Sequence, residues 1–392
     1  MGFNIWTDCP RVPITQLLEF IVDNRGKTVP TAPSGHKLIA TNCVTNNTLF
    51  PVYEKVRYLS DEIYRTWFRA HPIPGDILFV NKGTPGRVCM VPNPIDFCIA
   101  QDMIALRADD SKIYNKYLFA VLRSREIQQQ IYNTNVGDVI PHFKKQFMDQ
   151  LLIPVPDRKM QEVIGDLYYA LSYKVEHNKK INDNLYEILQ SVFQSRFGLS
   201  EESARVGTLS EICAYSKDRV AVSKLGVKNY YSTENMLPSK AGSVDAASLP
   251  TTQQTTKCNI GDVLVSNIRP YFKKIVYCQS EGGCSTDVLC FTPKLPSLSS
   301  YLFCTLYADS FFNYMVAGSK GTKMPRGDKL QIMTYPVVIP TEDELRAFDE
   351  VAQPILRKIH INSDENTYLA ALRDTLLPKL MSGEIDVSGI QL

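Results

Sequence analysis

The sequence has little net charge and no long hydrophobic run. Its 392 residues include 43 Lys and Arg against 41 Asp and Glu, which leaves a formal net charge of +2. No apolar stretch approaches the roughly 20 residues of a membrane-spanning helix, and the first segment, "MGFNIWTDCP", lacks the basic and apolar regions of a secretory signal. We expect a soluble, cytoplasmic protein that has no membrane partner.

Paired cysteines are also missing. The ten cysteines occur singly, without a C-x-x-C pair. Cys278, Cys284 and Cys290 come closest to a cluster, but their even spacing suits neither a zinc site nor an iron–sulfur site. We expect free thiols in a reducing compartment, buried as small hydrophobic side chains.

Motifs of the common catalytic classes are absent as well. There is no G-x-x-x-x-G-K-[ST] loop, no G-x-G-x-x-G turn for a dinucleotide, and no H-E-x-x-H pair for zinc. The tetrapeptide "NPID" at Asn93–Asp96 is similar to the N-P-P-[YF] signature of amino-methyltransferases. It lacks the second proline and the aromatic residue, so we interpret it as a turn. Catalysis, a metal ion and a cofactor are not expected in this chain.

An internal repeat is the most informative feature that is present. "PGDILFV" at residues 74–80 returns as "IGDVLVS" at residues 260–266. "NVGDVIPHFKKQFMDQLLIPVPD" at residues 135–157 returns as "SKGTKMPRGDKLQIMTYPVVIPT" at residues 319–341. The offset drifts only from 186 to 184 residues between these passages, as expected for a duplicated fold with small loop changes.

Each copy is predicted to form a domain of mixed α and β structure. Apolar runs bounded by Gly, Pro or Asn are typical of strands. A helix of about five turns is predicted after them in each copy, at Ile113–Tyr132 and Tyr301–Ala317. The predicted class is α/β (α+β). The strand candidates are "DILFV", "RVCMV" and "MIALR" in the first copy, and "DVLVS", "KIVYC" and "DVLCF" in the second.

A longer helix is predicted after each copy. Following Pro156, apolar residues recur at intervals of three and four over more than four heptads, and the pattern returns after Pro340. Thr341 and Glu344 have the spacing of a capping box, and each pattern ends near a glycine. We therefore predict four segments: a domain at 1–154, a helix at 155–198, a domain at 199–339 and a helix at 340–392.

The apolar seams of the two helices need a partner. We expect antiparallel pairing within the chain, with the domains related by a pseudo-twofold axis; a parallel dimer between chains is the alternative. Asn178 and Asn362 fall at equivalent seam positions, where a buried Asn fixes helix register, unless both are solvated. The predicted seams are Met160, Ile164, Leu167, Leu171, Asn178, Ile181, Leu185, Ile188 and Val192, and Glu344, Phe348, Val351, Ile355, Asn362, Glu365, Leu369, Leu372 and Leu376.

Charge is distributed unevenly over the four segments. The two domains carry net charges of +3 and +4, whereas the first helix carries 0 and the second −5. Mildly basic domains are compatible with a nucleic-acid partner, but this charge alone does not identify one.

The passage "ALRDTLLPKLMSGEIDVS" at residues 371–388, together with the duplication, resembles the specificity subunit of type I restriction-modification enzymes. "ITQLLEFIVDNRGKTVP" at residues 14–30 and "YYSTENMLPSK" at residues 230–240 resemble passages of its two target-recognition domains. The resemblance covers nearly the whole chain. One departure is "TEDELRAF" at residues 341–348, where many relatives carry a Glu-Gln pair.

The resemblance implies a non-catalytic, DNA-binding subunit that serves host defence. Each target-recognition domain would read one half of a bipartite site in double-stranded DNA, and the helices would set the spacing. Two modification subunits would dock on the chain, bind S-adenosylmethionine and methylate adenine. Restriction subunits would bring ATP, Mg²⁺, translocation and cleavage.

Residues that differ between the copies are the candidates for DNA contact, because two domains that read different bases should share a scaffold and differ at the bases. Basic loop residues fit this role, although they would look the same as solvated surface charges. The candidates in the first domain are Lys82, Arg87, His142, Lys144 and Lys145, and those in the second are Lys217, Arg219, Arg269, Lys273, Lys274, Lys320, Lys323 and Arg326.

Two other functions remain open at this point. In a self-contained DNA adenine methyltransferase, "NPID" would be a degenerate motif. In a coiled-coil scaffold without a DNA role, the long helices would be the functional part.

Overall fold

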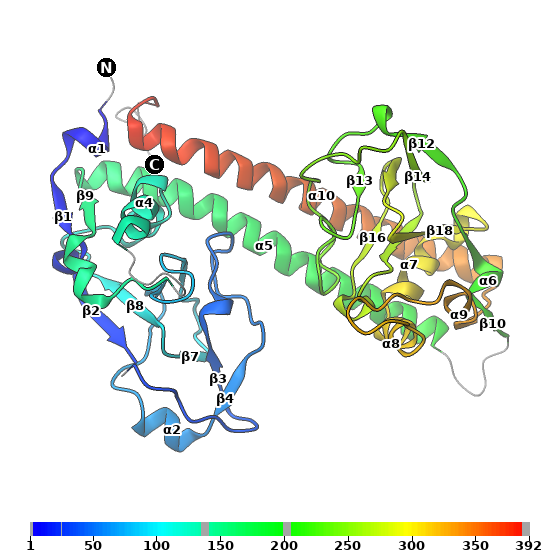
Figure 1. The fold of residues 1–392 in the computed structure, drawn as a ribbon, viewed down its shortest axis with the longest axis horizontal. Helices are drawn as coiled ribbons and strands as arrows, with labels where there is room; N and C mark the ends of the chain where they lie inside the picture. The colour runs from blue at the N-terminus through cyan, green and yellow to red at the C-terminus, as the bar shows by residue number, and fades with distance from the viewer. Residues whose placement is uncertain (1–2, 25, 135–140, 199–204, 386–392) are drawn as a thin grey trace. The chain divides into compact units, whose positions relative to one another are not determined.

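The computed structural model describes residues 3–24, 26–134, 141–198 and 205–385 (Figure 1). The start of the first repeated passage, including Gly137, and the last residues of the C-terminal motif lie outside this part. The chain divides into two compact units. Unit 1 comprises Met1–Lys180 and Ser363–Leu392, and unit 2 comprises Ile181–Asn362, so the division falls inside both long helices. None of the helices within the described ranges is both long enough and apolar enough to cross a membrane.

Unit 1 contains a four-stranded antiparallel sheet with the order β2-β8-β5-β6. A second sheet has the order β4-β3-β7, with β3 and β7 parallel, and β1 pairs with β9. Its short helices include α1 (Ile5–Asp8) and α2 (Asp61–Thr66). The strands span Arg11–Pro13 (β1), Leu18–Asp23 (β2), His36–Ile39 (β3), Arg57–Leu59 (β4), Ile77–Val80 (β5), Val88–Met90 (β6), Phe97–Ile99 (β7), Met103–Ala108 (β8) and Leu152–Pro154 (β9).

Unit 2 repeats this plan. Its first sheet has the order β11-β18-β15-β16, its second has the order β12-β14-β17-β13, and β10 pairs with β19. The strands span Val206–Thr208 (β10), Cys213–Tyr215 (β11), Arg219–Ala221 (β12), Tyr230–Tyr231 (β13), Gln254–Cys258 (β14), Val263–Ser266 (β15), Ile275–Tyr277 (β16), Gly282–Cys284 (β17), Val288–Pro293 (β18) and Pro336–Val338 (β19). The short helices are α6 (Leu209–Ile212) and α9 (Lys329–Ile332).

The central strand of each first sheet is buried on both faces. In β5, Ile77 and Phe79 belong to the core that includes the helices, whereas Leu78 and Val80 belong to the core shared with the second sheet. This alternation follows from the two-residue period of a strand. It explains why the repeated runs "DILFV" and "DVLVS" are apolar without interruption, and the strand predictions for both copies are confirmed.

The single helix predicted at Ile113–Tyr132 is wrong. The structure has two helices in this region, α3 (Asn115–Leu122) and α4 (Arg125–Thr134). Between them, the buried Ser124 accepts a hydrogen bond from Ile127 N at 3.4 Å through its hydroxyl group, as N-cap residues do.

The helix predicted at Tyr301–Ala317 is broken at the equivalent point. It consists of α7 (Ser299–Tyr307) and α8 (Asp309–Ala317), which are separated by Ala308 in an extended conformation. Extended backbone at this position ends the ladder of helical hydrogen bonds.

The two long helices are confirmed. α5 spans Arg158–Phe197 and α10 spans Glu342–Ser382, and they are coloured green and orange to red in Figure 1. The capping box is also confirmed, because Thr341 N donates to Glu344 Oε2 at 2.7 Å and Glu344 N donates to Thr341 Oγ1 at 3.4 Å.

The predicted seams have the right period, but their phase drifts in both units. In unit 1 Ser172 and Arg373 are buried, whereas the predicted Leu171 and Leu372 are only partly buried. In unit 2 Ile188 is 51% exposed whereas Leu189 is buried, and Leu356 is buried in place of Ile355. An α-helix has 3.6 residues per turn, so a pattern extended in steps of 3.5 drifts by about 20° per heptad.

Asn178 and Asn362 are both buried, so the alternative that they are solvated is wrong. In unit 1, Asn178 Nδ2 on α5 donates to Asn366 Oδ1 and Glu365 Oε2 on α10, at 3.0 and 2.7 Å. In unit 2, Asn362 Nδ2 on α10 donates to Asn182 Oδ1 on α5 at 2.8 Å. By the repeat, Asn178 is equivalent to Asn362 and Asn182 to Asn366, so one Asn–Asn contact joins α5 to α10 in each unit.

In each unit α5 and α10 run antiparallel. In unit 1 the Arg373 guanidinium lies over the Tyr168 ring, 5.6 Å from its centroid. Tyr168 precedes Asn178 in α5, whereas Arg373 follows Asn366, the partner of Asn178, in α10. In unit 2 the ring centroids of Phe193 and Phe348 lie 6.0 Å apart. Phe193 follows Asn182 in α5, whereas Phe348 precedes Asn362, the partner of Asn182, in α10.

Nine of the ten cysteines are buried, and Cys9 is partly buried; all are free thiols. Their predicted role as small hydrophobic side chains is confirmed for these nine. Over the described ranges, no group of three or more His, Cys, Asp or Glu side chains is arranged to hold a metal ion.

Candidate nucleic-acid interface

In unit 1 the loop between β5 and β6 lies against the loop that precedes β9. Gly83 N donates to Pro141 O at 3.0 Å, and Phe143 N donates to Asn81 O at 2.8 Å. A β-bridge between Lys82 and His142 lies between these two hydrogen bonds. Residues 80–88 and 141–145 are named the first loop pair.

Unit 2 contains the same arrangement. Arg269 N donates to Pro325 O at 2.8 Å, Gly327 N donates to Asn267 O at 3.2 Å, and a β-bridge joins Ile268 to Arg326. Residues 266–274 and 320–328 are named the second loop pair. All five candidates of unit 1 lie in the first loop pair on adjacent backbone segments, and the last of them, Lys145, also begins the short 3₁₀ helix Lys145–Gln150.

A buried asparagine anchors each loop pair. Asn81 and Asn267 are 8% and 7% exposed, and they directly follow the equivalent strands β5 and β15. Asn81 N donates to Asp102 O and Asn267 N donates to Asp287 O, both at 2.8 Å. Sequence reasoning missed these two residues, although a repeated Asn after both central strands was a visible signal.

Several predicted cations already have carboxylate partners. Lys145 Nζ lies 3.0 Å from Asp23 Oδ2 in unit 1. In unit 2, Arg326 Nη2 lies 3.1 Å from Asp287 Oδ1, and Lys320 Nζ lies 2.7 Å from Asp328 Oδ2. These pairs are partly or largely exposed, so each contributes little to stability and can exchange its carboxylate for a phosphate.

Lys273 is held by a cluster that the sequence did not reveal. Its Nζ lies 3.0 Å from Asp309 Oδ1, and Lys240 Nζ lies 2.6 Å from the same atom. The two ammonium groups lower the pKa of the Asp309 carboxyl by hydrogen bonding. The cluster therefore retains a net charge of +1.

Other predicted residues differ in their surroundings. Arg87, Lys144 and Lys323 are exposed, and Lys82 and His142 are partly exposed. Lys274 points inward: its Nζ donates to Thr233 O at 2.5 Å, and desolvation lowers its pKa.

Lys217 and Arg219 lie apart from the second loop pair in the fold. Arg219 begins β12, at the edge of the other sheet of unit 2, and Lys217 precedes this strand. Arg219 donates to Thr256 Oγ1 at 3.3 Å and to Gln254 O at 3.2 Å, both on the neighbouring β14. These two cations belong to a sheet edge, and the loop pair does not include them.

A buried carboxylate lies just before the central strand of each unit. Asp76 is 2% exposed, and its Oδ2 accepts a hydrogen bond from Ile73 N at 3.0 Å. Asp262 is 1% exposed, and its Oδ2 accepts from Asn259 N at 2.8 Å. This turn is the same in both copies.

The partners of the two carboxylates differ. Arg107 forms a two-point ion pair with Asp76, with Nε to Oδ1 at 3.0 Å and Nη2 to Oδ2 at 3.1 Å. By strand register Thr292 takes the place of Arg107 in unit 2. Asp262 instead has the Cys290 thiol 3.3 Å from its Oδ2, and burial raises its pKa.

Comparison with known proteins gives these loops a context. Residues 31–187 match the family described as "Type I restriction modification DNA specificity domain". The chain is similar to the type I restriction enzyme MjaIX specificity subunit of Methanocaldococcus jannaschii, with 21% identity over 344 residues that cover 80% of this chain and 78% of that protein. It is similar to the type I restriction enzyme HindI specificity subunit of Haemophilus influenzae, with 20% identity over 400 residues that cover 79% of this chain and 86% of that protein.

Together these matches indicate a specificity subunit of a type I restriction-modification system. The crystal structure of the type I system S subunit from M. genitalium has the same fold, with a TM-score of 0.56, 16% identity, and coverage of 95% of this specificity subunit and 96% of that one. The family predicted from the C-terminal motif and the duplication is therefore confirmed. A self-contained methyltransferase and a scaffold without a DNA role are not favoured for this specificity subunit.

Proposed function

We propose that this specificity subunit reads double-stranded DNA with one loop pair in each unit, so that each unit recognises one half of a bipartite target. The duplicated loop pair carries this proposal. Equivalent backbone hydrogen bonds hold both pairs, whereas the side chains that the loops present differ. A common backbone favours a common approach to the phosphates, and different side chains favour different base contacts.

Within each loop pair the cations have two roles in this proposal. Exposed residues such as Arg87, Lys144 and Lys323 neutralise phosphates, which makes binding fall steeply as salt rises. Arg326 and Lys320 exchange their carboxylate partners for DNA. Lys217 and Arg219 make a separate phosphate contact at the β12 edge, and Lys274 supports the loop from within.

Exchange of one domain tests the proposal. Residues 1–154 are replaced by the equivalent region of a relative with a known target, and methylated adenines are mapped in the genome of a host that carries the system. One half of the recognised sequence is expected to change, and the other half is expected to stay. Replacement of residues 199–339 is the matched control and should change the opposite half. A change of both halves by either exchange would contradict the proposal.

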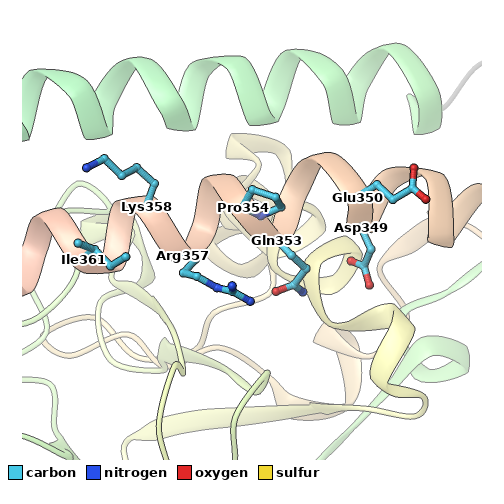
Figure 2. A pocket seen from close by; sticks show the side chains of 7 residues that line it. All are labelled: Asp349, Glu350, Gln353, Pro354, Arg357, Lys358 and Ile361. Atoms are coloured by element: carbon cyan, nitrogen blue, oxygen red, sulfur yellow. The ribbon is translucent and has the colours of Figure 1, made fainter.

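The long helices have a second proposed role: α5 and α10 set the spacing of the half-sites and dock two modification subunits. Exposed apolar side chains support docking, since Tyr368 in unit 1 is 65% exposed and Ile361 in unit 2 is 51% exposed. A shallow hollow lies on α10 beside Ile361. Figure 2 shows that Gln353 and Arg357 point to one side of this helix and Lys358 to the other. The full lining is Asp349, Glu350, Gln353, Pro354, Arg357, Lys358 and Ile361.

We further propose that all catalysis resides in the partners. The modification subunits supply S-adenosylmethionine, and the restriction subunits supply ATP and Mg²⁺. In this scheme the specificity subunit acts in the cytoplasm, on DNA, without chemistry of its own. Methyl transfer to DNA is expected from the complex and not from the purified chain, and transfer by the chain alone would refute this part.

A further inference from the structure

The first loop of the second loop pair has an unusual backbone. Arg269 and Lys273 both adopt left-handed conformations, with φ of 50° and 51°. The strand register places Gly83 and Gly86 at the equivalent positions of unit 1, with φ of 85° and 86°. A left-handed conformation costs a residue with a side chain roughly 1–2 kcal/mol, a cost that glycine avoids. Unit 2 thus has Arg269 and Lys273, which carry side chains, at the two positions where unit 1 has glycine.

Between these two positions the loop of unit 2 is longer. Phe79 pairs with Val88 across the loop in unit 1, and Val265 pairs with Ile275 in unit 2, which leaves one more residue in the second loop. Unit 1 has Thr84 and Pro85 between its two glycines. Unit 2 has Pro270, Tyr271 and Phe272, which form a short 3₁₀ turn.

Backbone hydrogen bonds from two other segments hold the strained turn. Arg269 N donates to Pro325 O at 2.8 Å, Ser239 N donates to Phe272 O at 2.8 Å, and Lys240 N donates to Lys273 O at 2.9 Å. Ser239 and Lys240 also have positive φ, 55° and 63°. Strained backbone that is held by its surroundings is typical of sites that position a functional group.

The held turn presents aromatic rings to solvent. Pro270 is buried beneath the turn, whereas Tyr271 is 50% exposed and Phe272 is 39% exposed. The two ring centroids lie 4.8 Å apart. On the adjoining loop Met324 is 51% exposed, next to the exposed Lys323. An exposed aromatic pair that Arg269 and Lys273 flank in the chain, with the exposed Lys323 on the adjoining loop, matches the two chemical features of nucleic acid, a flat base and an anionic backbone.

We propose that Tyr271 is a specificity-determining residue of unit 2, whose ring stacks on a base at one step of the half-site that this unit reads. The inference rests on the proposed function. Pyrimidine–purine steps unstack most easily, so a step of this kind is the expected partner. Unit 1 carries Thr84 and Pro85 at the equivalent place and reads its half-site without such a wedge.

The test uses the full chain in complex with its modification subunits. The target is first taken from the methylated adenines of the host genome. Duplexes with this target then carry 2-aminopurine at successive positions of each half-site, and its fluorescence rises where a base loses its stacking neighbour. Methyltransferases flip their target base out of the stack, so the methylated adenines are left out of the comparison. At the remaining positions, wild-type protein is expected to raise the fluorescence at one step in the half-site of unit 2 and at no step in the other half-site.

Two substitutions separate stacking from folding. Tyr271→Ala is expected to abolish the fluorescence rise and to weaken target binding by about 5- to 100-fold, which corresponds to the loss of one base–aromatic stack. Tyr271→Phe keeps the ring and is expected to keep both signals within about threefold. Tyr132→Ala, at a tyrosine that is 73% exposed on α4, is the control for loss of an exposed ring and should change neither.

The inference is overturned if Tyr271→Ala unfolds at the wild-type temperature and still binds with wild-type affinity and the same fluorescence rise. An equal loss of target binding and of the fluorescence rise in Tyr271→Phe and Tyr271→Ala would also overturn it, because a contact of the Tyr271 hydroxyl would then explain the effect. Failure of the proposed function looks different: the wild-type complex would not prefer the target duplex to a scrambled one.

Discussion

Unit 1 pairs a buried carboxylate with a partly buried arginine at the place where unit 2 buries a carboxylate without a cation. Asp76 has the two-point contact with Arg107, whereas Asp262 has a thiol neighbour, and Thr292 stands where the arginine would be. The turn that each carboxylate stabilises is the same. The backbone geometry of the duplicated scaffold is therefore maintained by the carboxylate's bonds to peptide N–H groups, and the charge partner is free to vary.

Removal of the arginine should have the largest effect. Arg107→Met leaves the Asp76 carboxylate buried without its cation, and such a loss costs about 3 kcal/mol of unfolding free energy. Both tryptophans of the chain, Trp6 and Trp67, lie in unit 1, so urea unfolding followed by tryptophan fluorescence reports on this unit.

Two variants control this measurement. Arg87→Met removes an exposed arginine from the same unit and should leave the transition in place. The double variant Asp76→Asn with Arg107→Met should recover part of the loss. A shift below about 0.5 kcal/mol for Arg107→Met alone would mean that the ion pair is not what neutralises the cost of burying Asp76.

The Asn–Asn contacts offer the next comparison. Replacement of Asn182 and Asn362 by leucine in the same protein should stabilise unit 2 by about 1 kcal/mol and weaken register control, because a polar seam pair costs stability and specifies alignment. Light scattering at increasing protein concentration is expected to show dimers or higher species of the variant.

The matched variant replaces Asn178 and Asn366. Glu365 and Lys174 adjoin this contact, with Lys174 Nζ 3.5 Å from Glu365 Oε2, so leucines here should yield less stabilisation. If both double variants remain monodisperse, these asparagines do not determine register.

Asp262 predicts a pH effect with a definite sign. Its folded pKa is raised by burial, so the unfolded chain releases this proton at lower pH than the folded chain. Below the ordinary Asp pKa the side chain is protonated in both states and does not lower the unfolding free energy. As pH rises through the window between the unfolded and folded pKa values, the unfolding free energy falls. Asp262→Asn should remove this loss and raise the unfolding free energy of unit 2 at pH 7 by about 1 kcal/mol.

Unit 2 contains no tryptophan, so circular dichroism is used to follow its unfolding. The gain should vanish near pH 3, where the wild-type side chain is protonated in both states. A gain of the same size at both pH values would assign the effect to packing.

The smallest effects are expected at the two left-handed positions. A Cβ atom at Gly83 would meet no atom within 4 Å, so Gly83→Ala tests backbone strain alone and should cost about 1 kcal/mol. Arg269→Gly is the reverse change in unit 2 and should stabilise that unit by about 0.5 kcal/mol, because the greater flexibility of unfolded glycine offsets part of the gain. Destabilisation by Arg269→Gly would show that the loop depends on the arginine side chain for its shape.

Features that depend on local pattern could be predicted from the sequence. The strands at "DILFV" and "DVLVS" were recognisable because both faces are buried, and the capping box at Thr341 was recognisable by its spacing. The break at Ser124 was missed because the apolar pattern continues through it. The phase at Ile188 was missed because the fixed heptad drifts from the real helix.

The candidate interface was predictable only in part. The sequence pointed to the correct loops through the repeat, but the contact of Gly83 with Pro141 joins residues far apart in the chain. The sharing of Asp309 by Lys240 and Lys273 also depends on tertiary structure. Whether a given cation touches DNA is a property of the complex, so the residue assignments stay predictions.

Unit 1 is built from both ends of the described chain, and this has a consequence for synthesis on the ribosome. Its core contains Ile5 and Ile164, but also Leu377 and Met381 from the last turns of α10. Unit 2 is one continuous segment and can complete its core while α10 is still being made. At about 5–20 residues per second, the first 180 residues wait roughly 10–40 s for the helix that completes their core. Unit 1, which is begun first, is thus completed after unit 2.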